Sequence, residues 1–189
     1  MNARLAEDLY PSRTGSISQI HARHDPVVYS HAPVGEFSLS RTELEQYDRD
    51  GFLLLRNHIP ADWISELRAE TTRLAGDPHT SRRASVITEP DSSEVRSLFN
   101  LPELSPVYDR VARSHRLLDI VMQLLGGPVY LHQSRINIKP AFHGKSFPWH
   151  SDFETWHVED GLPAIRCLSC SIFLTENSMF NGGGGGGSW

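Results

Sequence analysis

The possible fold and function of this chain are constrained most by a stretch rich in aromatic and acidic residues, FPWHSDFETWHVEDGLP at positions 147–163. Its centre holds His150 and Asp152, separated by one residue. If the stretch is extended, the side-chain period of two places both on the same face. The indoles of Trp149 and Trp156 flank the pair, as in a largely apolar pocket with a few polar groups.

A histidine nitrogen beside a carboxylate oxygen is two thirds of the two-histidine-one-carboxylate triad, which holds Fe(II) and leaves positions open for other ligands. The alternative is a histidine that is only salt-bridged to the nearby aspartate or capped by it. His157 is the local rival for the missing second histidine. On a strand its odd offset from His150 would point it away from the site, so we expect the third ligand elsewhere.

Polar residues also alternate along a predicted strand at 129–139, which a short loop connects to the His150 segment. The period of two puts four hydrogen-bonding side chains on one face: Gln133, Arg135, Asn137 and Lys139. This face is either the wet side of an antiparallel strand or the lining of a ligand cavity in a barrel. Its place just before the His150 segment favours the cavity.

The remaining sequence predicts helices first and strands afterwards, which is an α+β layout. Residues 1–36 read as a polar arm that is ordered only if it packs on the body. Helices are expected from the Ser40–Glu43 capping box to Gly51, from Pro60 to Gly76, and over 107–125, where His115 is expected to be a surface or capping residue. A buried strand is expected at 52–56, a loop at 77–93 and another strand at 165–175.

Composition excludes several classes of function. The net charge of −5 and the lack of a basic stripe argue against a nucleic-acid partner. No apolar stretch is long enough to span a membrane and no signal peptide is evident, so the expected location is the cytoplasm. Cys167 and Cys170 lie three apart on the predicted strand and so face opposite ways, which favours two buried thiols over a metal or redox pair.

The run from Trp149 to Pro163 closely resembles the signature of ectoine hydroxylases, a branch of the phytanoyl-CoA-dioxygenase-like, 2-oxoglutarate-dependent non-haem iron oxygenases. Three further segments are similar to that family: DLYPSR at 8–13, DGF at 50–52 with LLLR after it, and HQSRIN at 132–137. The resemblance extends to about Asn181. It implies a double-stranded β-helix (jelly-roll) core behind N-terminal helices.

The resemblance also implies roles for individual residues. His150 and Asp152 would be the catalytic iron ligands. Gln133 and Trp156 would contact the ectoine ring, with Arg135 and Thr155 in support. Residues around the 2-oxoglutarate would be Lys139, Asn137, Phe147 and Ser171. A cationic lysine suits a dicarboxylate, and an indole face suits ectoine's charge-delocalised ring.

The reaction implied is 5-hydroxylation of ectoine with Fe(II), O2 and 2-oxoglutarate, which yields 5-hydroxyectoine, succinate and CO2. The family resemblance also suggests a homodimer. Two alternatives are a related small-molecule hydroxylase of the same superfamily and a catalytically dead jelly-roll. The aromatic signature and the Gln133 strand argue against the first, and the missing third ligand supports the second.

The last residues, 182–189, contain six consecutive glycines and then Ser188 and Trp189. Ordering such a run costs much backbone entropy, so it reads as a non-native tail. The family instead continues into strands that carry a second iron histidine and an arginine for 2-oxoglutarate. We therefore expect an arm at 1–36, a partial dioxygenase domain at 37–181 and the tail, with little ectoine hydroxylation by the truncated chain alone.

Overall fold

The computed structural model describes residue 10 and residues 23–88, 94–138 and 150–176 of the 189-residue chain. These residues divide between two compact units. One contains residue 10, residues 23–26 and residues 150–168, and the other contains the described residues of 27–138 together with 169–176. Each unit is described by itself below.

The first helix of the larger unit, α1 (Arg41–Asp50), has the predicted capping box. The Ser40 hydroxyl accepts a hydrogen bond from the Glu43 amide, and the Glu43 carboxylate accepts one from the Ser40 amide at 2.8 Å. Gly51 ends the helix in the left-handed conformation with φ 73°, where a side chain would be strained. The predicted start and end of this helix are both confirmed.

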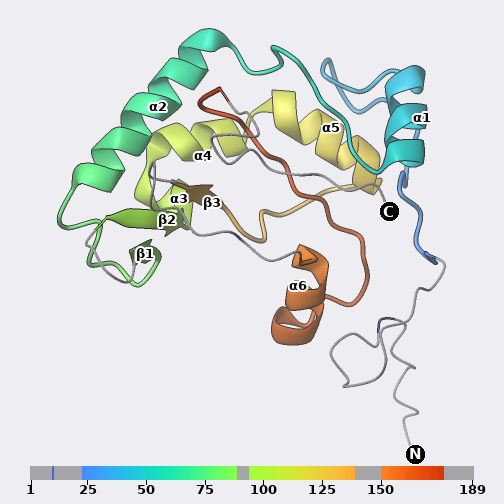
Figure 1. Cartoon of the computed structure of the whole chain (residues 1–189). Coiled ribbons are helices and arrows are strands. Elements are labelled where there is room, and N and C mark those ends of the chain that lie inside the picture. The colour runs from blue at the N-terminus through green and yellow to red at the C-terminus, as the bar shows by residue number, and fades with distance from the viewer. Residues whose placement is uncertain (1–9, 11–22, 89–93, 139–149, 177–189) are drawn as a thin grey trace, which may run out of the picture. The chain divides into compact units, whose positions relative to one another are not determined.

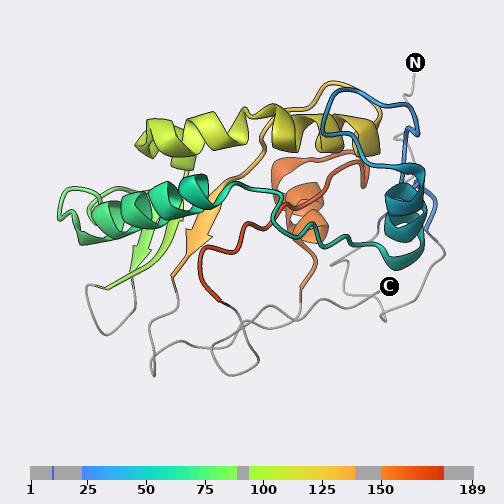
Figure 2. The ribbon, with the colours of Figure 1, turned by 90° about the horizontal axis from the view of Figure 1, so that it is seen from above.

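Helix α2 (Ala61–Gly76) supplies the apolar stripe expected after Pro60, with Leu67 and Leu74 fully buried. It packs against α4 (Pro106–Ala112), whose Tyr108 and Val111 enter the same core. The short helix α3 (Leu101–Leu104) precedes α4, and α5 (His115–Leu125) follows it. Figures 1 and 2 show α2 alongside α4, with α5 continuing beyond α4.

The sheet has three short antiparallel strands in the order β1–β2–β3. They are β1 (Val86–Thr88), β2 (Val95–Phe99) and β3 (Arg135–Asn137). The central strand contributes Leu98, which is completely buried, and pairs it with Ile136 of β3. The core of this unit therefore lies between the sheet and the helices α2 and α4.

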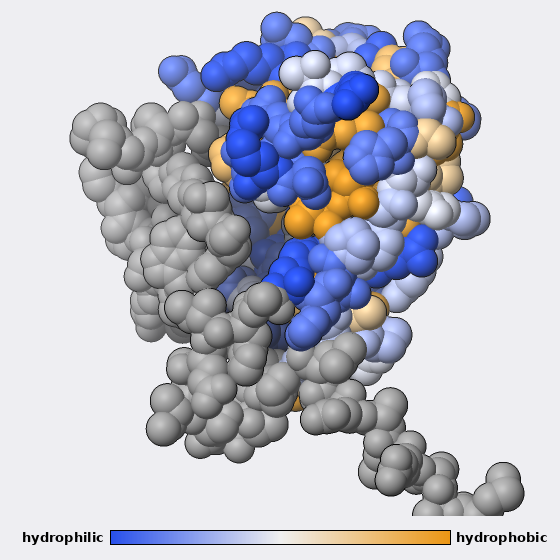
Figure 3. Space-filling model, turned by 90° about the vertical axis from the view of Figure 1, so that its right-hand side faces the viewer, coloured by the Kyte–Doolittle hydropathy of each residue, from blue (hydrophilic) through white to orange (hydrophobic). Residues whose placement is uncertain are grey.

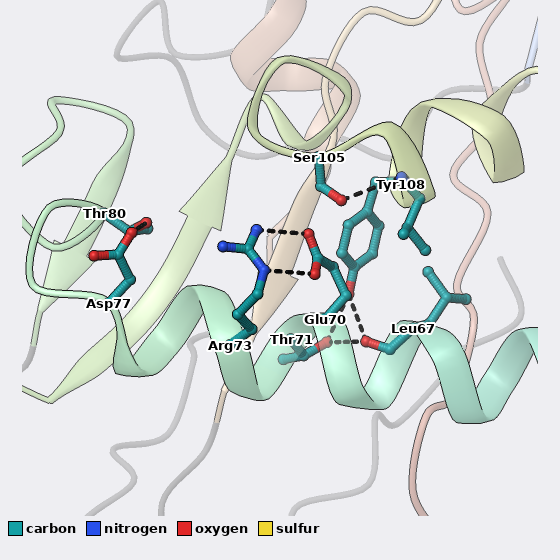
Figure 4. A network of polar contacts seen from close by, with 9 residues as sticks. Leu67, Glu70, Thr71, Arg73, Asp77, Thr80, Ser105 and Tyr108 are labelled. Atoms are coloured by element: carbon teal, nitrogen blue, oxygen red, sulfur yellow. Dashed lines mark hydrogen bonds and ion pairs between the residues drawn. The ribbon is translucent and has the colours of Figure 1, made fainter.

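Polar groups join α2 to the α4 region (Figure 4). The Tyr108 hydroxyl is 2.6 Å from the Thr71 hydroxyl and donates to the Leu67 carbonyl at 3.2 Å. Burial raises the pKa of Tyr108, so this hydroxyl stays protonated. One turn along α2, Arg73 binds the Glu70 carboxylate through two nitrogens at 2.7 and 2.8 Å.

Helix α5 holds the last part of the predicted arm through buried polar side chains. Gln123 is completely buried, and its amide accepts from the Leu39 N–H at 2.7 Å and donates to the Leu39 carbonyl at 3.2 Å. Asp119 accepts from the Phe37 N–H at 3.2 Å, and the Tyr29 N–H donates to the Leu124 carbonyl. Tyr29 of the predicted arm (1–36) and residues 37–39 just after it are thus bonded to α5, whereas residues 31–36 are exposed.

Several predictions about strands are wrong. Residues 52–56 form no strand, and Phe52 and Leu54 are more than half exposed instead of buried. Residues 165–175 are irregular, although Ile172 and Leu174 do pack on the core. In the described part of the predicted strand 129–139 only Arg135–Asn137 forms a strand, and the predicted loop 77–93 contains β1.

The smaller unit contains one helix, α6 (Asp152–Asp160), which occupies most of the stretch predicted to be extended. In neither unit, among the residues described, is a helix long and apolar enough to cross a membrane. Apolar atoms nevertheless reach the surface between polar ones on the face shown in Figure 3. Exposed apolar side chains are common in folded proteins, so we assign them no role.

Candidate metal and substrate site

The His150–Asp152 pair lies at the start of a helix and not on a strand. Asp152 and Glu154 put negative charge in the first turn of α6, where it is favourable beside the exposed amides and the positive end of the helix dipole. Gly161, with φ 74°, ends the helix, and its N–H donates to the Trp156 carbonyl. These local signals favour the helix over the predicted extended conformation.

The two predicted metal ligands are nevertheless close together. His150 Nε2 lies 3.4 Å from Asp152 Oδ1, and the side chains are 46% and 30% exposed. Two donors about 2.1 Å from one divalent metal and at right angles to each other are about 3 Å apart, so a small adjustment would fit both to one ion. The same distance equally allows the simple ion pair that the sequence left open.

The helix also changes which residues share a face with Asp152. Thr155 and Trp156 follow it at i+3 and i+4, a spacing that places all three on one side of α6. On a strand, Asp152 and Thr155 would point to opposite faces. Both Thr155 and Trp156 are half-buried, so the helix gathers a carboxylate, a hydroxyl and an indole.

His157 is held by another group. Its Nδ1 is 2.6 Å from the Leu162 carbonyl oxygen, which can only accept a hydrogen bond, so Nδ1 carries the proton. A protonated nitrogen cannot ligate a metal. The bond to Leu162 thus occupies Nδ1, one of the two ring nitrogens through which His157 could act as the third metal ligand.

Sequence reasoning missed the surroundings of His157. Its ring stacks on Phe153 at 5.5 Å between centroids, and Tyr10 meets both rings edge-on. The available signal was the i, i+4 spacing of Phe153 and His157, which has meaning only on a helix. Tyr10 belongs to the DLYPSR segment, whose similarity to the family was noticed without a role for the ring.

The second group of predicted site residues lies on and beside β3, in the larger unit. Gln133, Arg135 and Asn137 are exposed, whereas Ser134 and Ile136 between them are half-buried, so the predicted alternation is confirmed. Asn137 also has a structural contact, because its Oδ1 accepts from the Ser97 hydroxyl of β2 at 3.0 Å. Ser171 is an exposed residue of the irregular segment in the same unit.

Two predicted 2-oxoglutarate residues, Lys139 and Phe147, lie outside the described residues, as does Trp149. The two thiols differ from the expected buried pair, since Cys167 is partly buried and Cys170 is exposed. Burial, followed by the charge of Asp152, raises the pKa of Cys167 and keeps its thiol protonated.

Among the residues that the structure describes, no third histidine, cysteine, aspartate or glutamate joins His150 and Asp152 as a metal cluster. A surface hollow of about 520 Å³ lies elsewhere, between residues 34–37 and α5. The Asp119 carboxylate lines this hollow. It accepts a hydrogen bond from the Phe37 N–H and lies 3.2 Å from His115 Nδ1. His115 is 82% exposed, as predicted for a surface histidine, and the hollow contains none of the predicted site residues.

Comparison with known proteins finds close relatives of this chain. The chain is 51% identical over 177 residues to an ectoine dioxygenase of Bordetella parapertussis, covering 94% of this chain and 57% of the relative. It is 44% identical over 176 residues to the ectoine dioxygenase of Sphingopyxis alaskensis, covering 93% of this chain and 57% of the relative. The chain thus spans less than two thirds of the length of these relatives.

Solved crystal structures are also similar to this chain. The crystal structure of EctD from S. alaskensis with 2-oxoglutarate and 5-hydroxyectoine superposes with a TM-score of 0.78 at 44% identity, over 85% of this chain and 56% of that one. The structure of the same protein with bound Fe gives the same TM-score and covers 57% of that chain. The family model for phytanoyl-CoA dioxygenase (PhyH) matches residues 47–183. Since that match includes well over half of the sequence, the chain belongs to the phytanoyl-CoA dioxygenase family.

Proposed function

We propose that this chain carries the iron and substrate groups of an Fe(II)- and 2-oxoglutarate-dependent dioxygenase that converts ectoine to 5-hydroxyectoine, with succinate and CO2 as co-products. The observation that supports it best is the 3.4 Å approach of His150 to Asp152, next to Thr155 and Trp156 on the same helix. Similarity to proteins named ectoine dioxygenase supports the choice of substrate.

In this proposal His150 and Asp152 hold the iron. The bound metal and 2-oxoglutarate would supply the oxidising power with O2. The role of the protein is to bind and orient the substrate so that one C–H bond is presented to the reacting centre, because geometry decides which bond reacts. Trp156 offers its flat indole to the delocalised positive charge of the ectoine ring.

The family resemblance suggests further ligand contacts for residues of the larger unit and for Thr155. Gln133 would hydrogen-bond to ectoine with Arg135 and Thr155 in support, while Asn137, Ser171, Lys139 and Phe147 would surround 2-oxoglutarate. Gln133, Arg135 and Asn137 are exposed side chains, and Asn137 Oδ1 accepts a hydrogen bond from Ser97. We further propose that the three-stranded sheet is part of a jelly-roll core, a fold in which inward-facing residues line the ligand cavity.

The test is a chimera in which this chain replaces the 176 matching residues of the S. alaskensis ectoine dioxygenase. We expect Fe(II)- and 2-oxoglutarate-dependent formation of 5-hydroxyectoine, measured by mass spectrometry, and its loss in the His150→Ala chimera. A folded chimera that consumes 2-oxoglutarate with another small molecule but not with ectoine would refute the substrate.

If the chimera does not fold, metal binding is measured directly on the 189-residue chain. Co(II) is titrated into the 189-residue chain and followed by its absorption spectrum. We expect His150→Ala to weaken Co(II) binding at least tenfold, because half of the described donor pair is removed. Equal binding by the parent chain and His150→Ala would refute the metal assignment.

A further inference from the structure

Three aromatic rings meet in the unit that contains α6: Tyr10, Phe153 and His157, here called the Tyr10 cluster. The Phe153 and His157 rings stack with an interplanar angle of 25° and a centroid distance of 5.5 Å. Tyr10 meets Phe153 edge-on at 4.9 Å and His157 edge-on at 5.4 Å. Such edge-to-face pairs add to the stabilisation that burial of the rings provides.

The polar atoms of the cluster reach the segment that follows the helix. The His157 Nδ1–H donates to the Leu162 carbonyl at 2.6 Å. The Tyr10 hydroxyl accepts from the Ile165 N–H at 3.4 Å and donates to the Asp25 carboxylate. Two side chains therefore tie α6 to the chain that leaves it.

At the C-terminal end of α6, two backbone hydrogen bonds converge on one carbonyl group. The N–H groups of Gly161 and Leu162 both donate to the Trp156 carbonyl, the latter at 3.0 Å. The His157–Leu162 bond lies beside this pair and holds the same turn. The position of Trp156, the proposed substrate wall, thus depends on how the turn is closed.

Helix α6 is short and has a weak N-terminal cap. It has nine residues, and isolated helices shorter than about 12 residues are marginal in water. Its N-cap residue Ser151 makes no side-chain capping bond, and Phe153 is its only residue classed as buried. The rings and the C-terminal turn therefore contribute to holding the direction of the helix.

We propose that His157 and Tyr10 are positioning residues for the metal and substrate site. Neither touches a reacting atom. They fix the orientation of α6 through Phe153 and the Leu162 carbonyl, and so set where the Asp152 carboxylate lies beside His150. Asp152 immediately precedes Phe153, so rotation or fraying of α6 moves the carboxylate directly. This role rests on the proposed function, since it matters only if His150 and Asp152 bind a metal.

Three substitutions separate the ring contacts from the hydrogen bonds. His157→Phe keeps a flat ring on Phe153 and removes the donor to Leu162. His157→Asn keeps an N–H donor near the Nδ1 position and removes the ring. Tyr10→Phe keeps the ring and removes only the hydroxyl. The control is His79→Phe, an exposed histidine of the larger unit.

The measurement is Co(II) titration of the 189-residue chain, with affinity and the absorption spectrum at saturation as separate readouts. Loss of a group that orients a ligand weakens metal binding by about 10–100-fold. We expect a weakening of about tenfold and an altered spectrum for His157→Phe, recovery of the parental spectrum in His157→Asn, and a smaller weakening for Tyr10→Phe. A residue that only stabilised the fold would leave the spectrum of the saturated site unchanged.

Parental affinity and spectrum in His157→Phe, together with lost binding in His150→Ala, would overturn the positioning role and leave the proposed function intact. Parental binding in His150→Ala would refute the metal assignment itself. If circular dichroism shows that His157→Phe does not fold, Tyr10→Phe decides. A Co(II) affinity and spectrum equal to those of His79→Phe would then overturn the proposal.

Discussion

Replacing Gln123 by methionine should release the segment 29–39 from α5. The substitution keeps length and approximate volume, but it removes both side-chain hydrogen bonds to Leu39. The Leu39 N–H and carbonyl would then be left without these partners, in a residue that is only 6% exposed. An unsatisfied buried polar group costs about 1–3 kcal/mol, so the two together should lower the free energy of unfolding by about 2–6 kcal/mol.

The assay is urea unfolding of the 189-residue chain, followed by circular dichroism. With an m-value of about 2 kcal/mol/M, this loss lowers the midpoint by about 1 M or more. Hydrogen exchange gives a local readout, because the Leu39 amide should lose its protection. The matched control is Gln46→Met, at a half-buried glutamine of α1. If Gln123→Met shifts the midpoint no more than this control and the Leu39 amide stays protected, the reasoning is refuted.

Three further outcomes follow from the site and the caps. His150→Ala and Asp152→Ala should each weaken Fe(II) binding at least tenfold in calorimetry while the circular dichroism spectrum is retained; unchanged affinity would contradict their assignment as ligands. Trp156→Ala in the chimera should raise KM for ectoine more than it weakens Fe(II) binding; an equal loss of metal would make the indole a structural residue. Hydrogen bonds from the Ser40 hydroxyl and amide hold the pKa of Glu43 below its ordinary value of 4.5, so its stabilising effect is present above that value and is lost as pH falls through the folded-state pKa. Glu43→Gln should therefore flatten the acid side of the stability profile, and a profile that keeps the parental slope below pH 4.5 would contradict this.

The helices of the larger unit were predictable because their signals are local. The Ser40–Glu43 capping box and the terminating Gly51 act within a few residues, and the leucine stripe of α2 repeats along one face. Such signals need no knowledge of the rest of the chain.

The predicted strands depended on partners that sequence alone does not reveal. Residues 52–56 have the composition of a strand, but the described sheet gives them no neighbour. For α6 the helix signals were present, with acidic residues in the first turn and Gly161 at the end, yet the spacing of His150 and Asp152 suggested a strand. Both conformations bring the pair together, so the prediction that His150 and Asp152 are metal ligands does not depend on the secondary structure and stays a prediction.

The pairing of Gln123 with Leu39 also has a kinetic consequence. The two residues are 84 positions apart, and closing a flexible loop of that length costs about 4 kcal/mol of chain entropy. Two hydrogen bonds, each with a net gain of about 1 kcal/mol, cannot offset this cost in an unfolded chain. The core between α2, α4 and the sheet must form first and shorten the loop, so residues 29–39 dock late in folding and are among the first to detach when the chain unfolds.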